Sequence, residues 1–471
     1  MSEELRVARR AGTVATATML SRVLGLVREQ VMAALFGAGL ATDAFNVAFR
    51  IPNLLRDLFA EGAMSSAFVP TFTAVRQREG ERAAWSFGRQ LMIALVVVLG
   101  VLCAAGYVAA PWLVPLIAPG FAAIPGKLEL TITLTRVMLP FLPAVALAAV
   151  AMGMLNACGS FAVPALAPTM LNLGMIVGGV ALIPAVERFG QPAILAMALG
   201  VVMGGAAQFA CQLPALYRRG FRLRLESPWG HPGVLRVATL MGPAAVGLAA
   251  TQINLFVSTL IASLLEQGSV SWLGYAFRLM QLPIGVFGVA LATVSMPALA
   301  KAAVDDDLPA LKTTLSATLR LVFLLTAPAA LWLAVLAAPV ITLLYEHGRF
   351  GPLDTARTAG ALVMYCVGLP AFAASGVLTR AFYALGDTRT PVRASFVSVA
   401  LNLVLNLLFI GPLRPLGLGH TGLALATSVT AIASLVQLTW YLRRRVGPLE
   451  GRRMLNTLWR VGAAASLAAI P

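Results

Sequence analysis

Charged residues are scarce in this sequence, and acidic residues are scarcer than basic ones. Only 11% of the 471 residues are charged, whereas a soluble domain carries about 25%. The four cysteines show no spacing typical of a zinc site, a redox pair or a disulfide framework. The composition therefore argues against a soluble domain of any size and against a small disulfide-stabilised fold.

Sequence signatures of catalysis are also missing. No HExxH, GxSxG or GxxxxGK[ST] segment occurs in the chain. The run Asp305-Asp306-Asp307 is interpreted as a solvated loop rather than a metal cluster. The three histidines are predicted in loops or at helix ends: His231, His347 and His420. We therefore expect no enzymatic activity and no cofactor.

Long apolar runs are what the sequence does contain. Hydrophobic residues make up 59% of the chain, and the runs reach about the 20 residues that a membrane-spanning helix needs. Strands of a membrane barrel would be about 10 residues long and alternate in polarity, which these runs do not. We predict an all-α polytopic membrane protein with about twelve spans, at 11–36, 44–74, 84–110, 130–155, 162–183, 193–217, 234–264, 272–300, 311–344, 357–384, 392–411 and 420–442.

Basic residues gather on one side of this predicted topology. The 35 Lys and Arg exceed the 19 Asp and Glu, which gives a formal net charge of +16. Most of the cations fall in every second loop, and the positive-inside rule places those loops and the N-terminus in the cytoplasm. The excess charge then reflects topology and contact with anionic membrane lipids rather than nucleic-acid binding. The first span carries charges of its own, so we interpret it as a permanent anchor and not a cleaved signal.

Similar segments recur at nearly one offset in the two halves of the chain. An Ala-Phe-Arg segment at 48–50 reappears at 276–278, and a pattern of proline and glycine at 143–164 reappears at 370–391. Transporters are often built from such repeats. We predict two six-helix lobes related by a parallel repeat around a central cavity, then a cytoplasmic loop and the start of a thirteenth helix, at residues 1–225, 226–445 and 446–471.

Several arginines fall inside the predicted spans. Each costs at least about 2.5–3.5 kcal/mol at the bilayer centre. Such residues must face an aqueous interior, pair with carboxylates or reach the membrane surface. They are Arg22, Arg28, Arg50, Arg56, Arg136, Arg278 and Arg320.

Helical spacing sorts these arginines into faces. Residues seven apart share a face about 10 Å apart along the axis, so Arg22 lies above Glu29 and Ser21 above Arg28. A polar stripe in the second span suggests that one side of this helix faces water. It consists of Arg50, Asn53, Asp57 and Glu61, with Arg56 beside it. Two interpretations remain open, buried ion pairs such as Arg22–Glu29 and Arg50–Asp57, or a cationic cavity for an anionic ligand. For Arg136 and Arg320 we favour a structural role over ligand binding.

Several segments resemble one family closely. They are SRVLGLVR at 21–28, FGAGLATDAF at 36–45, AFRIPNLLR at 48–56, YAFRLMQLP at 275–283 and AFYALGDTRTP at 381–391. The chain resembles the MviN/MurJ family of lipid II flippases over essentially its full length. The resemblance implies the fold of the multidrug/oligosaccharidyl-lipid/polysaccharide exporter superfamily, with two C-terminal helices that are expected to be truncated here. It also implies a multi-pass protein of the bacterial inner membrane.

The resemblance also implies a binding site. The family's cavity arginines fall on Arg22, Arg28, Arg56 and Arg278, and its acidic residue near the outer end of the first two spans falls on Asp43. With the polar residues beside them, the expected substrate-binding set is Arg22, Arg28, Arg56, Arg278, Ser21, Asn53, Asp43 and Glu61.

The sequence departs from relatives at two points. Many relatives carry an acidic residue where this chain has Phe277, which leaves Arg278 less neutralised. Some relatives bind sodium through carboxylates on the seventh and eleventh helices, where this chain offers the amides Asn254, Asn402 and Asn406. Coupling to a monovalent cation is therefore left open.

The leading hypothesis is movement of lipid II, an undecaprenyl-diphosphate-linked peptidoglycan precursor, from the cytoplasmic to the periplasmic leaflet by alternating access. The arginines would hold the diphosphate, and the protein is expected to act as a monomer. Two alternatives are a cation-coupled multidrug antiporter and a flippase for another polyprenyl-diphosphate oligosaccharide of the same superfamily. An antiporter for cationic drugs would need an acidic cavity, whereas the excess here is basic. A membrane glycosyltransferase would need a larger soluble face than these loops provide.

Overall fold

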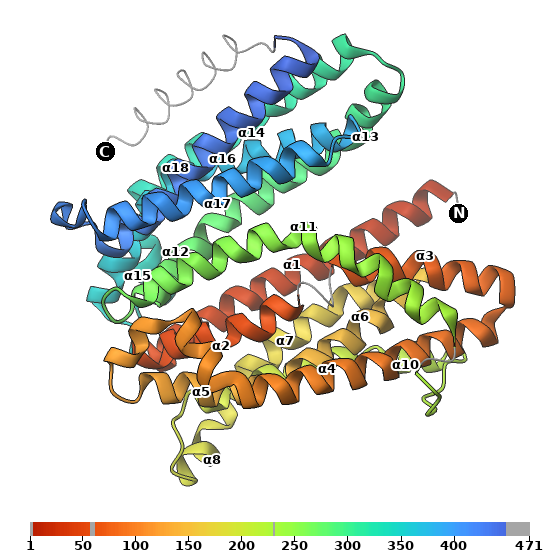
Figure 1. Ribbon diagram of the computed structural model, residues 1–471, viewed down its shortest axis with the longest axis horizontal. Coiled ribbons are helices and arrows are strands. Elements are labelled where there is room, and N and C mark those ends of the chain that lie inside the picture. Colours follow the sequence, from red (N-terminus) through yellow and green to blue (C-terminus); the bar gives the residue numbers. More distant parts are fainter. Residues whose placement is uncertain (1–2, 57–61, 229–230, 449–471) are drawn as a thin grey trace. The chain divides into compact units, whose positions relative to one another are not determined.

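The computed structural model describes residues 3–56, 62–228 and 231–448, and every regular element in these ranges is a helix (Figure 1). The all-α prediction is confirmed. The main helices are α1 (Glu3–Phe36), α2 (Leu40–Arg56), α3 (Gly62–Glu79), α4 (Glu81–Ile117), α5 (Lys127–Met138), α6 (Phe141–Ala157), α7 (Ala162–Ala181), α8 (Ile183–Arg188), α9 (Leu195–Ala210), α10 (Leu213–Tyr217), α11 (Pro232–Ser263), α12 (Ser269–Pro283), α13 (Ala290–Val304), α14 (Leu308–Val335), α15 (Ala337–Tyr345), α16 (Pro352–Ala384), α17 (Arg389–Ile410) and α18 (Gly419–Val446).

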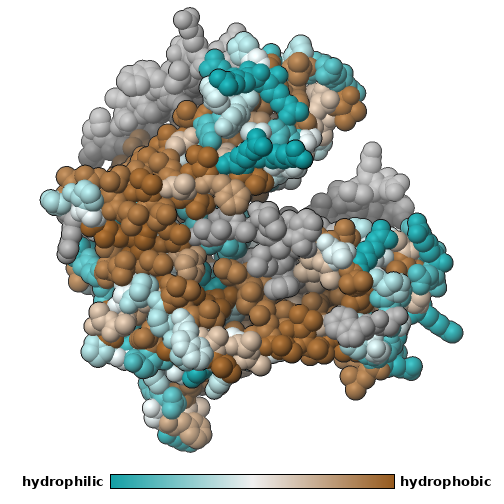
Figure 2. All heavy atoms as spheres, in the orientation of Figure 1, coloured by the Kyte–Doolittle hydropathy of each residue, from teal (hydrophilic) through white to brown (hydrophobic). Residues whose placement is uncertain are grey.

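Nine helical segments of the described ranges are long and apolar enough to cross a membrane. They match nine of the predicted spans. The predicted span at 11–36 is not among them and carries Arg22, Arg28 and Glu29. The predicted span at 44–74 is described only in part, because residues 57–61 lie outside the described ranges. Within α11 there are two shorter apolar stretches, Pro232–Met241 and Asn254–Ser263. Apolar side chains cover the middle of the helices in Figure 2, and hydrophilic ones gather at helix ends and loops. That distribution is typical of a membrane protein, in which lipid surrounds the middle of the helices.

Proline marks the breaks within several spans. Pro140 lies between α5 and α6, and Pro283 ends α12 before a π-helical turn at Ile284–Val289. Proline removes a backbone donor and displaces the carbonyl one turn earlier, so the helix bends or restarts there. Accordingly, α5 and α6 are separate helices on either side of Pro140, and the winding changes after Pro283.

The chain divides into two compact units, Met1–Ala249 and Ala250–Pro471, with the division inside α11. The predicted lobe boundary at residue 225 falls before that helix. In the first unit, aromatic rings from α3 and α4 pack together in the core, with Phe68, Phe72 and Phe87 fully buried and in contact. The parallel repeat and the lobe boundaries stay predictions.

Glycines bring α7 and α9 into backbone contact. A Cβ atom placed on Gly174 would lie 2.5 Å from the Cα of Gly204, and one on Gly178 would lie 2.6 Å from the Cα of Gly200. Each helix thus presents two glycines four residues apart on one face, a pattern that lets membrane helices approach closely. This contact fixes the position of α7, which lies along α1 (Figure 1).

We expect Gly200→Leu to destabilise the first unit by about 1–3 kcal/mol, because the new side chain has no room against α7. The melting temperature of the purified protein in detergent measures this effect. Gly100→Leu is the matched control, because Gly100 is exposed on α4 and a Cβ atom placed there would have no neighbour within 4 Å among the described residues. Equal melting temperatures for the two variants would contradict the close packing of α7 on α9.

Candidate functional site

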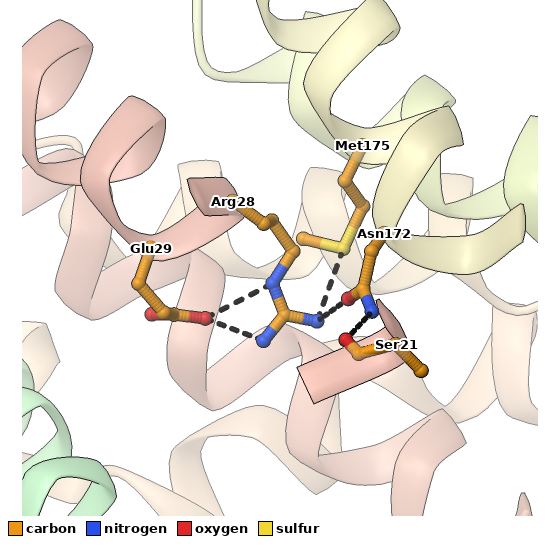
Figure 3. A network of polar contacts seen from close by, with 5 residues as sticks. All are labelled: Ser21, Arg28, Glu29, Asn172 and Met175. Atoms are coloured by element: carbon orange, nitrogen blue, oxygen red, sulfur yellow. Dashed lines mark hydrogen bonds and ion pairs between the residues drawn. The ribbon is translucent and has the colours of Figure 1, made fainter. Parts of the chain in front are cut away.

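The guanidinium of Arg28 is the centre of a polar network inside the first unit (Figure 3). Its Nε donates to Glu29 Oε1 at 3.0 Å, and its Nη2 forms an ion pair with the same oxygen. Its Nη1 donates to Asn172 Oδ1 at 3.0 Å. The Arg28 side chain is 17% exposed and the Glu29 side chain 10% exposed. Among the contacts of the described residues, the Glu29 carboxylate and the neutral Asn172 amide hold this cation at low exposure.

The second helix of the network is α7. Asn172 accepts from Arg28 and donates through Nδ2 to the backbone carbonyl of Ser21 at 3.0 Å. The Met175 Sδ, one turn further along α7, lies 3.8 Å from Arg28 Nη1. The structure thus brings together the predicted residues Ser21 and Arg28, and Ser21 takes part through its carbonyl oxygen rather than its hydroxyl.

An ion pair between Arg22 and Glu29, one of the two open interpretations, is not formed in the described part of the protein. Glu29 instead pairs with Arg28, its neighbour in sequence, through the Nε and Nη2 groups of the guanidinium. Arg22 is exposed and makes no hydrogen bond or ion pair with any residue that the structure describes. Arg22 therefore carries a charge that the described part of the protein leaves to solvent or a ligand.

The polar stripe predicted in the second span is described only in part. Arg50, Asn53 and Arg56 are half-buried on α2, around the buried Pro52. Asp57 and Glu61 lie outside the described residues, so the predicted Arg50–Asp57 pair and the site role of Glu61 stay predictions. Arg56, the last described residue of α2, continues the polar positions of this helix.

Arg278 belongs to the second unit. It is half-buried on α12, and the ring of the preceding Phe277 packs against Tyr365 at 5.5 Å between centroids. The aromatic contact explains how an apolar residue is accommodated at position 277. An acidic residue there would add a counter-charge one position from Arg278, which this chain does without.

Asp43 forms a buried ion pair with Lys127. Its Oδ2 accepts from Lys127 Nζ at 2.8 Å, and both side chains are almost fully buried, at 1% and 2% exposed. The ammonium also lies 4.1 Å from the ring centre of Phe121. Lys127 falls in a loop of the predicted topology and is instead the first residue of α5. Its partner is not visible in the sequence, because the two residues are far apart along the chain.

Arg136 and Arg320 both donate hydrogen bonds to backbone carbonyls. Arg136 donates to the backbone carbonyl of Tyr107 at 3.0 Å and stacks on that ring at 4.7 Å. Arg320 donates to the carbonyl of Ser316 in its own helix at 3.3 Å. These contacts agree with a structural role for both.

Two of the three amides that stand where some relatives bind sodium, Asn402 and Asn406, are in contact in the second unit. Asn406 donates to Asn402 Oδ1 at 2.9 Å, and Ser258 donates to the same oxygen at 3.4 Å. The buried Oδ1 atoms of Asn254 and Asn406 have no hydrogen-bond partner among the described residues. The described members of this amide cluster are neutral, so none of them is a carboxylate that would offset the charge of a bound cation.

Comparison with known proteins shows to which family the chain is similar. A family model described as "Lipid II flippase MurJ" matches residues 32–471. A probable lipid II flippase MurJ of Vibrio cholerae is 38% identical over 97% of this chain and 86% of its own length. A lipid II flippase MurJ of Burkholderia cenocepacia is 39% identical over 92% of this chain and 83% of its own length.

Solved structures of two transporters are similar to this chain over most of its length. "Lipid II flippase MurJ, inward closed conformation" superposes with a TM-score of 0.80 at 26% identity, over 96% of this chain and 91% of that one. An inward-facing multidrug resistance transporter of the MATE family superposes with a TM-score of 0.76 at 15% identity, over 93% and 98%. The second likeness is one of fold alone.

Proposed function

The chain belongs to the lipid II flippase MurJ family, and from this we infer that it moves lipid II across the bacterial inner membrane. The direction is from the cytoplasmic to the periplasmic leaflet, by alternating access, in support of cell-wall synthesis. The N-terminus faces the cytoplasm in this proposal, as the distribution of basic loops favours. The protein is a transporter rather than an enzyme and acts as a monomer.

The observation that supports this function best is the Arg28 guanidinium, held inside the first unit beside the Glu29 carboxylate. The diphosphate of lipid II carries oxygens that match the same N–H donors, since a guanidinium fork binds carboxylate and phosphate in one geometry. Glu29 occupies the Nε and Nη2 side of that fork. In our proposal the diphosphate competes for this side, and Glu29 neutralises Arg28 when no substrate is bound.

The remaining predicted residues complete the binding set in this proposal. Arg22, Arg56 and Arg278 supply further positive charge for the diphosphate and the head group, and Asn53 and Glu61 supply polar lining. Cationic drugs would be repelled by such a set, which disfavours the multidrug antiporter. Because the amide cluster of the second unit is neutral, we propose a cycle that needs neither a cofactor nor sodium.

A transport assay tests the function. Purified protein in proteoliposomes is expected to expose fluorescent lipid II to the opposite leaflet, at indistinguishable rates in NaCl and KCl. In cells, the gene is expected to rescue growth of a strain depleted of its own flippase. Export of a cationic dye without movement of lipid II would support the antiporter instead, and a rate that falls when sodium is replaced would contradict the sodium-independent cycle.

A further inference from the structure

Asn172 is a buried amide at the contact between α1 and α7, with 8% of its surface exposed. We propose that Asn172 is the positioning residue of the site: it holds the Arg28 guanidinium in place for the substrate diphosphate without neutralising it. The inference rests on the proposed function, because it assigns a role relative to the arginine that binds substrate. Nothing in the sequence singles it out, since Asn172 lies alone in an apolar span.

The hydrogen bonds fix which way the amide points. Arginine can only donate, so the Asn172 atom facing Arg28 must be the oxygen. A backbone carbonyl can only accept, so the atom facing Ser21 must be the nitrogen. Asparagine meets both demands at once. Aspartate would place an acceptor against the Ser21 carbonyl, and leucine, of similar size, would offer neither group.

The shape of α1 explains why one amide can span both partners. Ser21 and Arg28 are seven residues apart, so they share a face about 10 Å apart along the axis. The arginine side chain points back toward the N-terminus of its helix and covers the turn that contains Gly25. A Cβ on Gly25 would already lie 3.7 Å from Asn172 Nδ2 and 3.9 Å from its Oδ1. An alanine would therefore just fit, and a branched side chain would displace the amide.

Asn172 is neutral, which distinguishes it from Glu29 as a partner of Arg28. Glu29 cancels the charge of the guanidinium, whereas the amide orients it and leaves the charge in place. An arginine that must exchange a carboxylate for a phosphate needs a second partner that stays when the first one leaves. Asn172 is suited to that part, because its helix is fixed by the glycine contact with α9.

The test compares apparent Kd for fluorescent lipid II with melting temperature, both measured on purified full-length protein in detergent. We expect Asn172→Leu to weaken binding roughly tenfold, since a hydrogen bond to a charged group is lost. Asn172→Asp is expected to weaken binding at least as much, because it adds a second anion beside Arg28. Gly25→Val should act in the same direction, and Gly25→Ala should bind like the unmodified protein.

Gln212→Leu is the matched control. Gln212 is another fully buried amide of the first unit, and its Nε2 donates to the carbonyls of Ala148 and Gln208. It is expected to lower the melting temperature and leave Kd unchanged. An unchanged Kd in both Asn172→Asp and Gly25→Val would overturn the inference, even if Asn172→Leu failed to fold.

Arg28→Ala, measured in parallel, separates the two levels of the proposal. If Arg28→Ala weakens binding and the Asn172 variants do not, the inference fails and the proposed function stands. If Arg28→Ala itself binds lipid II normally, the role of Arg28 in the proposed function fails, and with it the inference that depends on it.

Discussion

Arg28→Glu is expected to abolish lipid II transport, with a loss of roughly a hundredfold or more. The substitution places a carboxylate where the guanidinium now meets Glu29 and the Oδ1 of Asn172. A site that attracts a diphosphate would become one that repels it, at a side-chain exposure of only 17%. Transport of fluorescent lipid II in proteoliposomes and rescue of a flippase-depleted strain both measure the effect.

Two further variants sharpen this result. Arg28→Lys keeps the charge but loses the planar fork, so we expect partial activity. Arg136→Gln is the control, because Arg136 contacts the carbonyl and ring of Tyr107 and is not part of the predicted site; its transport rate should stay close to that of the unmodified protein. Full activity of Arg28→Glu in a membrane-inserted, folded protein would refute the binding role of Arg28.

Lys127→Met is expected to cost about 3–5 kcal/mol of folding free energy, the largest stability effect we predict. The substitution leaves the Asp43 carboxylate without the ammonium 2.8 Å away, at a position where only 1% of the side chain is exposed. It also removes the cation from the Phe121 ring. Melting temperature in detergent is the direct measurement.

The double variant Asp43→Leu/Lys127→Met separates stability from transport. Replacing both charges by apolar residues of similar size is often neutral or stabilising, because neither ion then has to be desolvated. We expect the melting temperature to recover and transport to stay impaired, since Asp43 belongs to the predicted substrate-binding set. A Lys127→Met protein that melts like the unmodified one would show that the buried pair contributes nothing to stability.

Local patterns in the sequence were enough to predict the helices. Apolar runs of about the bilayer thickness leave the backbone no alternative in lipid, and nine of the predicted spans reappear as qualifying helices in the described ranges. The exceptional arginines were also found from the sequence alone, because a charge inside an apolar run is an anomaly that needs no structure to detect. The family resemblance drawn from segments such as 21–28 and 48–56 agrees with the family model and the relatives.

The tertiary structure decided which groups meet. Spacing along α1 suggested that Glu29 pairs with Arg22, but Glu29 pairs with Arg28, its neighbour in the same helix. Asn172 reaches Arg28 across 144 positions of sequence, and Lys127 reaches Asp43 across 84. Helical periodicity assigns a residue to a face of its own helix and contains no information on which other helix packs there. That depends on close packing between distant segments, here on the glycines that hold α7 against α9, so the partners of the buried charges emerged only from the folded chain.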